Sequence, residues 1–140
     1  MKLTTYLNFD GNTREAFEFY AGLLGGRIVA MMTYGETPGC EDMAEADRGK
    51  IMHARLEIGG DALMATDSTP QYPYHRIRCA YVVFDADSSA DAERIFAALS
   101  AGGEVEMPMQ ETFWAHRYGI TVDRFGVPWM INHAKPMPAG

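Results

Sequence analysis

Residues 77–103, IRCAYVVFDADSSADAERIFAALSAGG, decide the fold of this chain. The β-branched and aromatic residues of 77–84 predict a strand, and Ser88 or Ser89 is placed to cap a helix after it. Gly102-Gly103 predicts the end of that helix. The apolar residues of the helix recur at helical spacing and are Ala92, Ile95, Phe96 and Leu99. The segment therefore predicts a strand, a helix and a sharp stop, in that order.

The same order occurs near the N-terminus. Residues 2–9 predict a strand, Asp10-Gly11-Asn12 breaks it, and Asn12 or Thr13 can cap a helix. Gly25-Gly26 ends this helix as Gly102-Gly103 ends the other. The apolar residues of this helix are Phe17, Tyr20, Leu23 and Leu24. The chain therefore repeats one unit along its length.

Three further strands are expected after each helix. They are 27–34, 51–58 and 61–66 in the first half, and 104–111, 115–122 and 127–133 in the second. A long polar loop is expected at 35–50. Gly59-Gly60 predicts a tight hairpin, and Phe125-Gly126 takes the corresponding place. Pro128 lacks the backbone N–H of a strand ladder, so an edge strand or a bulge is expected there.

The element order is therefore βαβββ twice, which predicts an α+β fold. We expect a single domain over residues 1–140, with one module at about 1–70, a second at about 75–134 and a loose tail at 135–140. One module leaves a sheet face exposed. The two modules are therefore expected to join into a curved eight-stranded mixed sheet, with the helices on its convex face.

Composition excludes several classes of partner. The 140 residues carry a net charge of −7, and a protein that binds nucleic acid needs a basic face instead. No apolar stretch reaches the length of a membrane span, and no signal segment is evident, so we expect a cytoplasmic protein without a membrane partner. Cys40 and Cys79 are then expected to be reduced thiols.

Three segments carry a resemblance to a known family. They are Tyr-Leu-Asn-Phe-Asp-Gly-Asn (6–12), Tyr34-Gly35-Glu36 with His53-Ala54, and the C-terminal pair Gln-Glu-Thr-Phe-Trp-Ala-His (110–116) and Asp-Arg-Phe-Gly-Val-Pro-Trp-Met-Ile-Asn (123–132). The chain resembles the vicinal-oxygen-chelate (glyoxalase/bleomycin-resistance) superfamily, and within it the PhnB-like subgroup, also labelled 3-demethylubiquinone 3-methyltransferase-like. The resemblance covers essentially the whole chain. It implies a small-molecule cleft on the concave sheet face and a homodimer.

The resemblance also implies where a divalent metal would be held. The family's four ligand positions fall here on Thr5, Met64, Cys79 and Met130, and none of these is the His, Glu or carboxamide that the family's metal enzymes use. A hard cation prefers oxygen or imidazole ligands. We therefore expect no metal and no other cofactor, and a cleft that these side chains line for an apolar or aromatic ligand.

His53, Arg55 and Glu57 share one face of the strand at 51–58, opposite Ala54, Leu56 and Ile58. On the concave side they would form a polar wall of the cleft, with His53 as a candidate acid or base. The alternative is a solvated row linked by weak surface pairs. Both interpretations stay open from the sequence.

A second group lies in the motif at 110–118. Glu111 and His116 are candidate catalytic residues, and Trp114 and Tyr118 are candidate ligand contacts. The alternative is that the aromatic residues brace a turn or a dimer contact. Tyr34 and Tyr81 complete the expected ligand-binding set, while Trp129 is expected to face a helix.

Three functions fit these observations. The preferred one is a binding protein or metal-free enzyme for a small apolar or aromatic molecule. The second is a metal-dependent lyase, isomerase or dioxygenase with a non-standard ligand set such as His53, Glu57, Glu111 and His116. The third is a drug-sequestering resistance protein.

Overall fold

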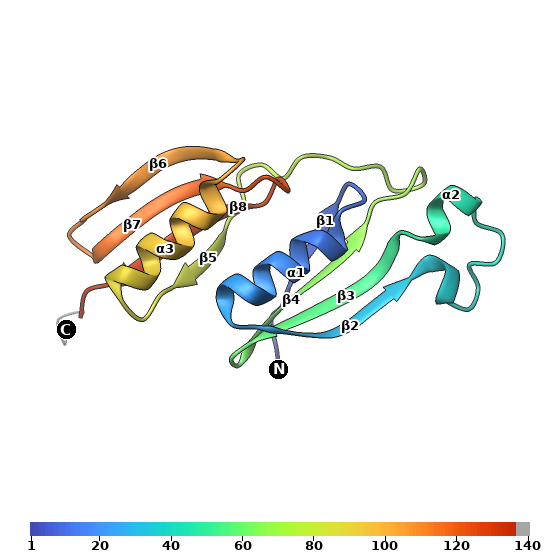
Figure 1. The fold of residues 1–140 in the computed structure, drawn as a ribbon, viewed down its shortest axis with the longest axis horizontal. Helices are drawn as coiled ribbons and strands as arrows, with labels where there is room; N and C mark the ends of the chain where they lie inside the picture. Colours follow the sequence, from blue (N-terminus) through green and yellow to red (C-terminus); the bar gives the residue numbers. More distant parts are fainter. Residues whose placement is uncertain (137–140) are drawn as a thin grey trace. The chain divides into compact units, whose positions relative to one another are not determined.

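The computed structural model describes residues 1–136, and the chain divides into two compact units, Met1–His75 and Arg76 onward. Each unit contains one four-stranded mixed sheet with a long helix along one face (Figure 1). Among the described residues, no helix is both long and apolar enough to cross a membrane.

The first unit follows the predicted order. Its elements are β1 (Thr5–Phe9), α1 (Thr13–Leu24), β2 (Arg27–Thr33), β3 (Ile51–Ile58) and β4 (Asp61–Asp67). The strand order in the sheet is β1-β4-β3-β2, with β1 parallel to β4 and the other pairs antiparallel. The segment predicted as a loop holds two short helical turns, η1 (Tyr34–Glu36) and α2 (Glu45–Arg48).

The second unit repeats this arrangement. Its elements are β5 (Val82–Asp85), α3 (Ser89–Ser100), β6 (Glu104–Gln110), β7 (Ala115–Val122) and β8 (Pro128–Ala134). The strand order is β5-β8-β7-β6, with β5 parallel to β8. The predicted α+β fold of two βαβββ modules is confirmed. The union of the two sheets into one curved eight-stranded sheet stays a prediction.

Each helix buries an apolar stripe against its own sheet. Phe17 and Tyr20 of α1 are fully buried over β3 and β4, and Phe96 and Leu99 of α3 are buried over β7 and β8. Trp129 faces this helical side of its sheet and is 1% exposed, as predicted. Because side chains alternate along a strand, the other half of the side chains of each sheet point to the face opposite the helix of the same unit, which we call the open face.

The start of α1 differs from the prediction. Asn12 occupies the cap position, but its side chain makes no capping bond. Asp67, at the end of β4, accepts hydrogen bonds from Thr13 N (3.0 Å), Thr13 Oγ1 (2.7 Å) and Ile51 N (2.7 Å). A carboxylate from another strand therefore replaces the local cap. In the second unit Ser88 caps α3 as predicted, by accepting from Asp91 N at 3.0 Å.

Both glycine pairs end their helices. The two glycines of each pair are required for different physical reasons. Gly25 and Gly102 have φ angles of 70° and 75°, which disfavour any side chain. A Cβ on Gly26 would lie 2.9 Å from Glu57 O, and one on Gly103 would lie 2.1 Å from Val122 O. The first glycine of each pair allows the left-handed turn after the helix, and the second leaves room for the backbone of a neighbouring strand.

Several local expectations were wrong. Strand β5 begins only at Val82, so Cys79 lies before it, with a φ of 60°. Strand β8 is an inner strand, and Pro128 is accommodated because it is the first residue of that strand. Phe125-Gly126, by contrast, does lie in the β7–β8 turn as expected; this turn spans residues 123–127, and within it Asp123 Oδ1 accepts from Phe125 N and Val127 N.

The tail was predicted to be loose from residue 135, but residue 135 itself is held in place. Lys135 N donates to Trp114 O at 2.8 Å, and Lys135 Nζ donates to Thr112 O at 2.9 Å, so this residue is fixed to the loop before β7. The rest of the predicted tail, from residue 137 onward, lies outside the described residues.

Candidate functional site

The open face of the first sheet is defined by strand register. Leu7 and Phe9 are buried on the helical side, so Tyr6 and Asn8 point the other way. Tyr6 is in register with Met64, and Met64 with Arg55. These three side chains therefore lie side by side across β1, β4 and β3, on the face opposite α1.

Tyr6 and His53 form a pair on this face. The Tyr6 hydroxyl lies 3.2 Å from His53 Nδ1, and the two rings are stacked with centroids 5.9 Å apart. The hydroxyl donates when that nitrogen is unprotonated and accepts when it carries hydrogen. The structure thus gives His53 an aromatic and hydrogen-bonding partner that the sequence analysis did not identify.

Tyr6, rather than Thr5, occupies the first-strand position on the open face. Thr5 alternates with Tyr6 and so shares the side of Leu7 and Phe9. The apolar pair Leu7 and Phe9 was the signal that could have corrected the assignment. A ligand on the open face would contact the Tyr6 ring.

The pKa of the Tyr6 phenol is raised above its usual value. Burial is the largest cause, and the neighbouring Tyr34 phenol acts in the same direction, while a hydrogen bond from Thr66 acts against them. The phenol is therefore neutral around pH 7. It can donate or accept a hydrogen bond, but it does not supply a negative charge.

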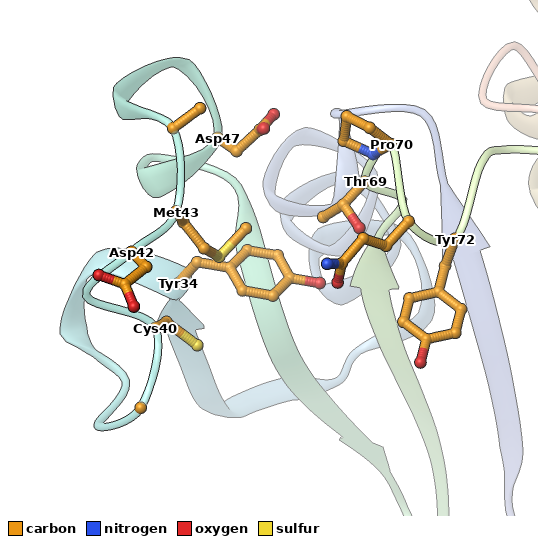
Figure 2. A pocket seen from close by; sticks show the side chains of 11 residues that line it. Tyr34, Cys40, Asp42, Met43, Asp47, Thr69, Pro70 and Tyr72 are labelled. Carbon is orange, nitrogen blue, oxygen red and sulfur yellow. The ribbon is translucent and has the colours of Figure 1, made fainter.

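Tyr34 lies beside this face, in the turn after β2. Its hydroxyl is 3.3 Å from Thr66 Oγ1 and donates to Asp67 O at 3.3 Å. Thr66 was not predicted as a site residue, and it in turn donates to Ile51 O at 3.1 Å. The ring of Tyr34 also lines a pocket of about 450 Å³, with Met43 beside it (Figure 2). Tyr34 therefore borders both the open face and the pocket.

Arg55 and Glu57 are on the predicted face of β3. Both are half-buried, and Glu57 is in register with Arg27 of β2 and Ala62 of β4. The buried positions Ala54 and Leu56 confirm the alternation that defined the row, although Ile58 at its end is only half-buried. His53, Arg55 and Glu57 therefore form a row on one face of the first sheet, and its role as a wall of a ligand cleft stays a prediction.

The second unit carries an aromatic group of its own. Trp114 contacts Phe113 edge to face, with centroids 4.9 Å apart, and contacts Tyr118 at 5.3 Å. Met130 lies on the open face of this sheet, in register with Val83 and Ile120. Phe113 is 91% exposed, which makes it the outermost member of the group.

The predicted residues Glu111, His116 and Tyr81 have separate partners in the second unit. Glu111 forms an ion pair with Lys135 at 3.2 Å. His116 packs against His133, with ring centroids 5.1 Å apart. Tyr81 donates to Glu106 at 3.2 Å, and this bond raises the pKa of its phenol. Catalytic roles for Glu111 and His116 stay predictions.

The side chains at the four expected ligand positions do not suit the divalent metal that the resemblance implies. Tyr6 replaces Thr5 in the predicted set, Met64 and Met130 contribute thioethers, and Val83 rather than Cys79 lies opposite Met130. None of these is an imidazole or a carboxylate. Within residues 1–136, no three His, Cys, Asp or Glu side chains are grouped as metal ligands. We derive no chemical step through a metal.

Comparison with known proteins places the chain in a family. Residues 1–132 match the family described as 3-demethylubiquinone-9 3-methyltransferase. The chain belongs to this family. It is also 35% identical to protein YjdN of Escherichia coli (strain K12) over 150 residues, with 99% of each chain covered.

Solved structures agree with this assignment. Protein PA1353 from Pseudomonas aeruginosa is 47% identical with a TM-score of 0.88, covering 95% of this chain and 97% of its own. The PhnB protein from Bacillus cereus is 25% identical with a TM-score of 0.78, covering 96% and 100%. The fosfomycin resistance protein FosX from Mesorhizobium loti, at 11% identity and a TM-score of 0.62 over 96% of this chain and 92% of its own, shares the fold alone. The vicinal-oxygen-chelate prediction is thus supported as far as the fold.

Proposed function

We propose that this PhnB-like protein binds a small apolar or aromatic molecule on the open face of its first sheet, without a divalent metal. The observation that carries the proposal is the Tyr6–His53 pair, which is stacked and hydrogen-bonded on the face of the first sheet opposite α1. Phenol and imidazole together offer a ring surface and a directional hydrogen bond. A flat ligand with one hydroxyl or carbonyl group uses both.

The neighbouring side chains support this ligand class. Met64 is in register with Tyr6 and supplies a deformable apolar surface. Arg55 lies next to Met64, and its guanidinium can approach the polar edge of a bound ring. We propose that Tyr6 and His53 orient the polar group of the ligand while Met64 contacts its apolar part.

The metal-dependent alternative is not favoured by the geometry. His53 and Glu57 are four residues apart on one strand, a separation of about 13 Å in extended chain. One ion cannot be shared over that distance, since ligand bonds are about 2 Å long. Glu111, the third member of that set, is paired with Lys135 at 3.2 Å.

Methyl transfer, which the description of the family names, is not part of the proposal. A methyl-donor nucleotide is usually held by a glycine-rich turn that leads from a strand into a helix. Here the glycine pairs follow α1 and α3 instead of preceding them, and only Gly11 lies in the turn from β1 to α1. Within residues 1–136, neither α1 nor α3 is preceded by such a turn.

The test is a ligand screen by thermal unfolding of chelator-treated protein against phenolic compounds. A phenol at one hundred times its Kd should stabilise the fold by about 2.7 kcal/mol, which raises Tm. His53→Ala should remove most of this shift. His75→Ala, an exposed histidine in the segment before β5, should retain it.

Two results contradict the proposal. One is the absence of a shift with any phenol in the screen. The other is a shift that appears only when a divalent metal is restored. Bleomycin is included as a separate arm, and stabilisation by bleomycin alone would favour the drug-sequestering alternative.

A further inference from the structure

We infer that the pocket beside Tyr34 is a second binding site, which takes a small organic cation such as an alkylated ammonium. The pocket has a volume of about 450 Å³, which is within the range of small-molecule sites. Its walls come from residues 39–47, between β2 and β3, and from residues 69–72, which follow β4 (Figure 2). All of its lining residues belong to the first unit.

The charge around the pocket favours a cation. Asp42 and Asp47 line it, and within the part of the chain that the structure describes none of its lining residues is Lys, Arg or His. Residues 36–50 contain five acidic side chains and two basic ones. An anionic ligand would therefore meet repulsion without a compensating contact, whereas a cation is attracted.

Both basic side chains of this segment are already engaged. Arg48 donates to Met43 O and to Glu41 O, each at 3.1 Å. Lys50 Nζ lies 2.8 Å from Asp47 Oδ1. Lys50 therefore compensates the charge of Asp47, and the attraction of the pocket for a cation depends on Asp42, which lines it and is exposed.

The uncharged lining indicates an organic cation. Tyr34 and Tyr72 contribute aromatic rings, and Met43 and Cys40 contribute sulfur atoms. An alkylated ammonium uses the ring faces through cation–π attraction and the sulfur atoms through apolar contact. A bare metal ion needs several converging oxygen or nitrogen ligands, and the two acidic residues alone do not provide them.

Local hydrogen bonds hold the walls in place. The Tyr34 hydroxyl is tied to Thr66 and Asp67, as described above. Consecutive turns link Thr37 N to Tyr34 O, Cys40 N to Thr37 O and Met43 N to Cys40 O. A wall that is already ordered loses little conformational entropy when a ligand binds. The pocket is thus preformed in the protein.

This inference is independent of the proposed function, because neither Tyr6 nor His53 lines the pocket. It can be tested by following backbone amide chemical shifts during titration with choline and with 3,3-dimethylbutan-1-ol, which has the same shape without the charge. Choline should shift residues 39–47 and 69–72 and bind roughly three- to tenfold more tightly than the alcohol. Equal binding of the two compounds, or shifts confined to the face around Tyr6 and His53, overturns the inference.

Charge variants give the matched control. Asp42→Asn should weaken choline binding roughly threefold or more, whereas Glu45→Gln, an equal change of charge on an exposed residue of α2 outside the lining, should have a smaller effect. Tyr72→Leu should weaken choline more than the alcohol, because it removes a ring face. Equal effects of Asp42→Asn and Glu45→Gln contradict a specific site and indicate general attraction to an acidic protein.

Discussion

Tyr6 combines, in one side chain, the ring and the hydroxyl on which the proposed site depends. Its hydroxyl meets His53, its ring stacks on the imidazole, and its pKa is raised chiefly by burial. A raised pKa means that the folded protein holds the phenolic proton to a higher pH than the unfolded chain does. Tyr6 therefore links the proposed ligand site to stability at alkaline pH.

The sign of this linkage can be measured. The contribution of Tyr6 is fully present below about pH 10, the usual tyrosine pKa, and is lost as pH rises through the raised value. Tyr81 and Lys50 have raised pKa values as well and add to the same decline. Tyr6→Phe should make the fall in unfolding free energy above pH 10 less steep in urea titrations. An unchanged slope would show that the Tyr6 phenol ionises alike in both states.

The sheet face on which a residue lies was predictable where the alternation of side chains along a strand determined it. His53, Arg55 and Glu57 followed from the pattern of β3, because a buried apolar face fixes the opposite one. Tyr6 was not predicted as a site residue, because the resemblance assigned the first-strand site position to Thr5. Cys79 was misplaced because its φ of 60° arises in an irregular segment, for which the sequence has no periodic signal.

Asp67 holds together the starts of α1 and β3 from its place at the end of β4. Its carboxylate is 2% exposed and accepts three hydrogen bonds, from Thr13 and Ile51. Asp67→Asn replaces one accepting oxygen with a donor that faces these N–H and O–H groups. It should lower the unfolding free energy by about 2–4 kcal/mol, measured by urea denaturation.

The matched control for this change is Asp61→Asn, on an exposed residue of the same strand. It should alter stability by less than about 0.5 kcal/mol. An equal loss of unfolding free energy in the two variants would mean that Asp67 contributes only its charge and not its three hydrogen bonds.

The glycine pairs make a second prediction about elements. Gly102→Ala places a side chain at a φ of 75°, which costs about 1–2 kcal/mol. Gly103→Ala also forces β7 away, because its Cβ would lie 2.1 Å from Val122 O, so it should destabilise the protein more. Gly60→Ala, with nothing within 4 Å of its Cβ, is the control. Thermal unfolding ranks the stability of the three variants. A larger loss of stability for Gly102→Ala than for Gly103→Ala would contradict the steric argument.

The order of elements was predictable, because glycine pairs, capping serines and apolar periodicity are local signals. The role of Asp67 was not, since its partner Thr13 is 54 residues away along the chain. The inner position of β8 was missed for the same reason. Strand order depends on pairing between distant segments, which local patterns do not encode.

The two units share one topology but carry different chemistry. The first has the Tyr6–His53 pair and the pocket beside Tyr34, whereas the second has the Trp114 group and Met130. The repeated order of the sequence predicted the shared topology. The chemical difference followed from single residues on the open faces. Homodimer formation, which the resemblance implied, stays a prediction.

In the proposed function, the first sheet binds its ligand through Tyr6 and His53 without a metal. The most direct measurement is a crystal structure of chelator-treated protein grown with the phenol that raises Tm most. The phenol ring should lie over Met64, with its oxygen within hydrogen-bonding distance of Tyr6 or His53. A divalent cation held on this face by histidine and carboxylate, or a phenol bound only elsewhere, would contradict the proposed function.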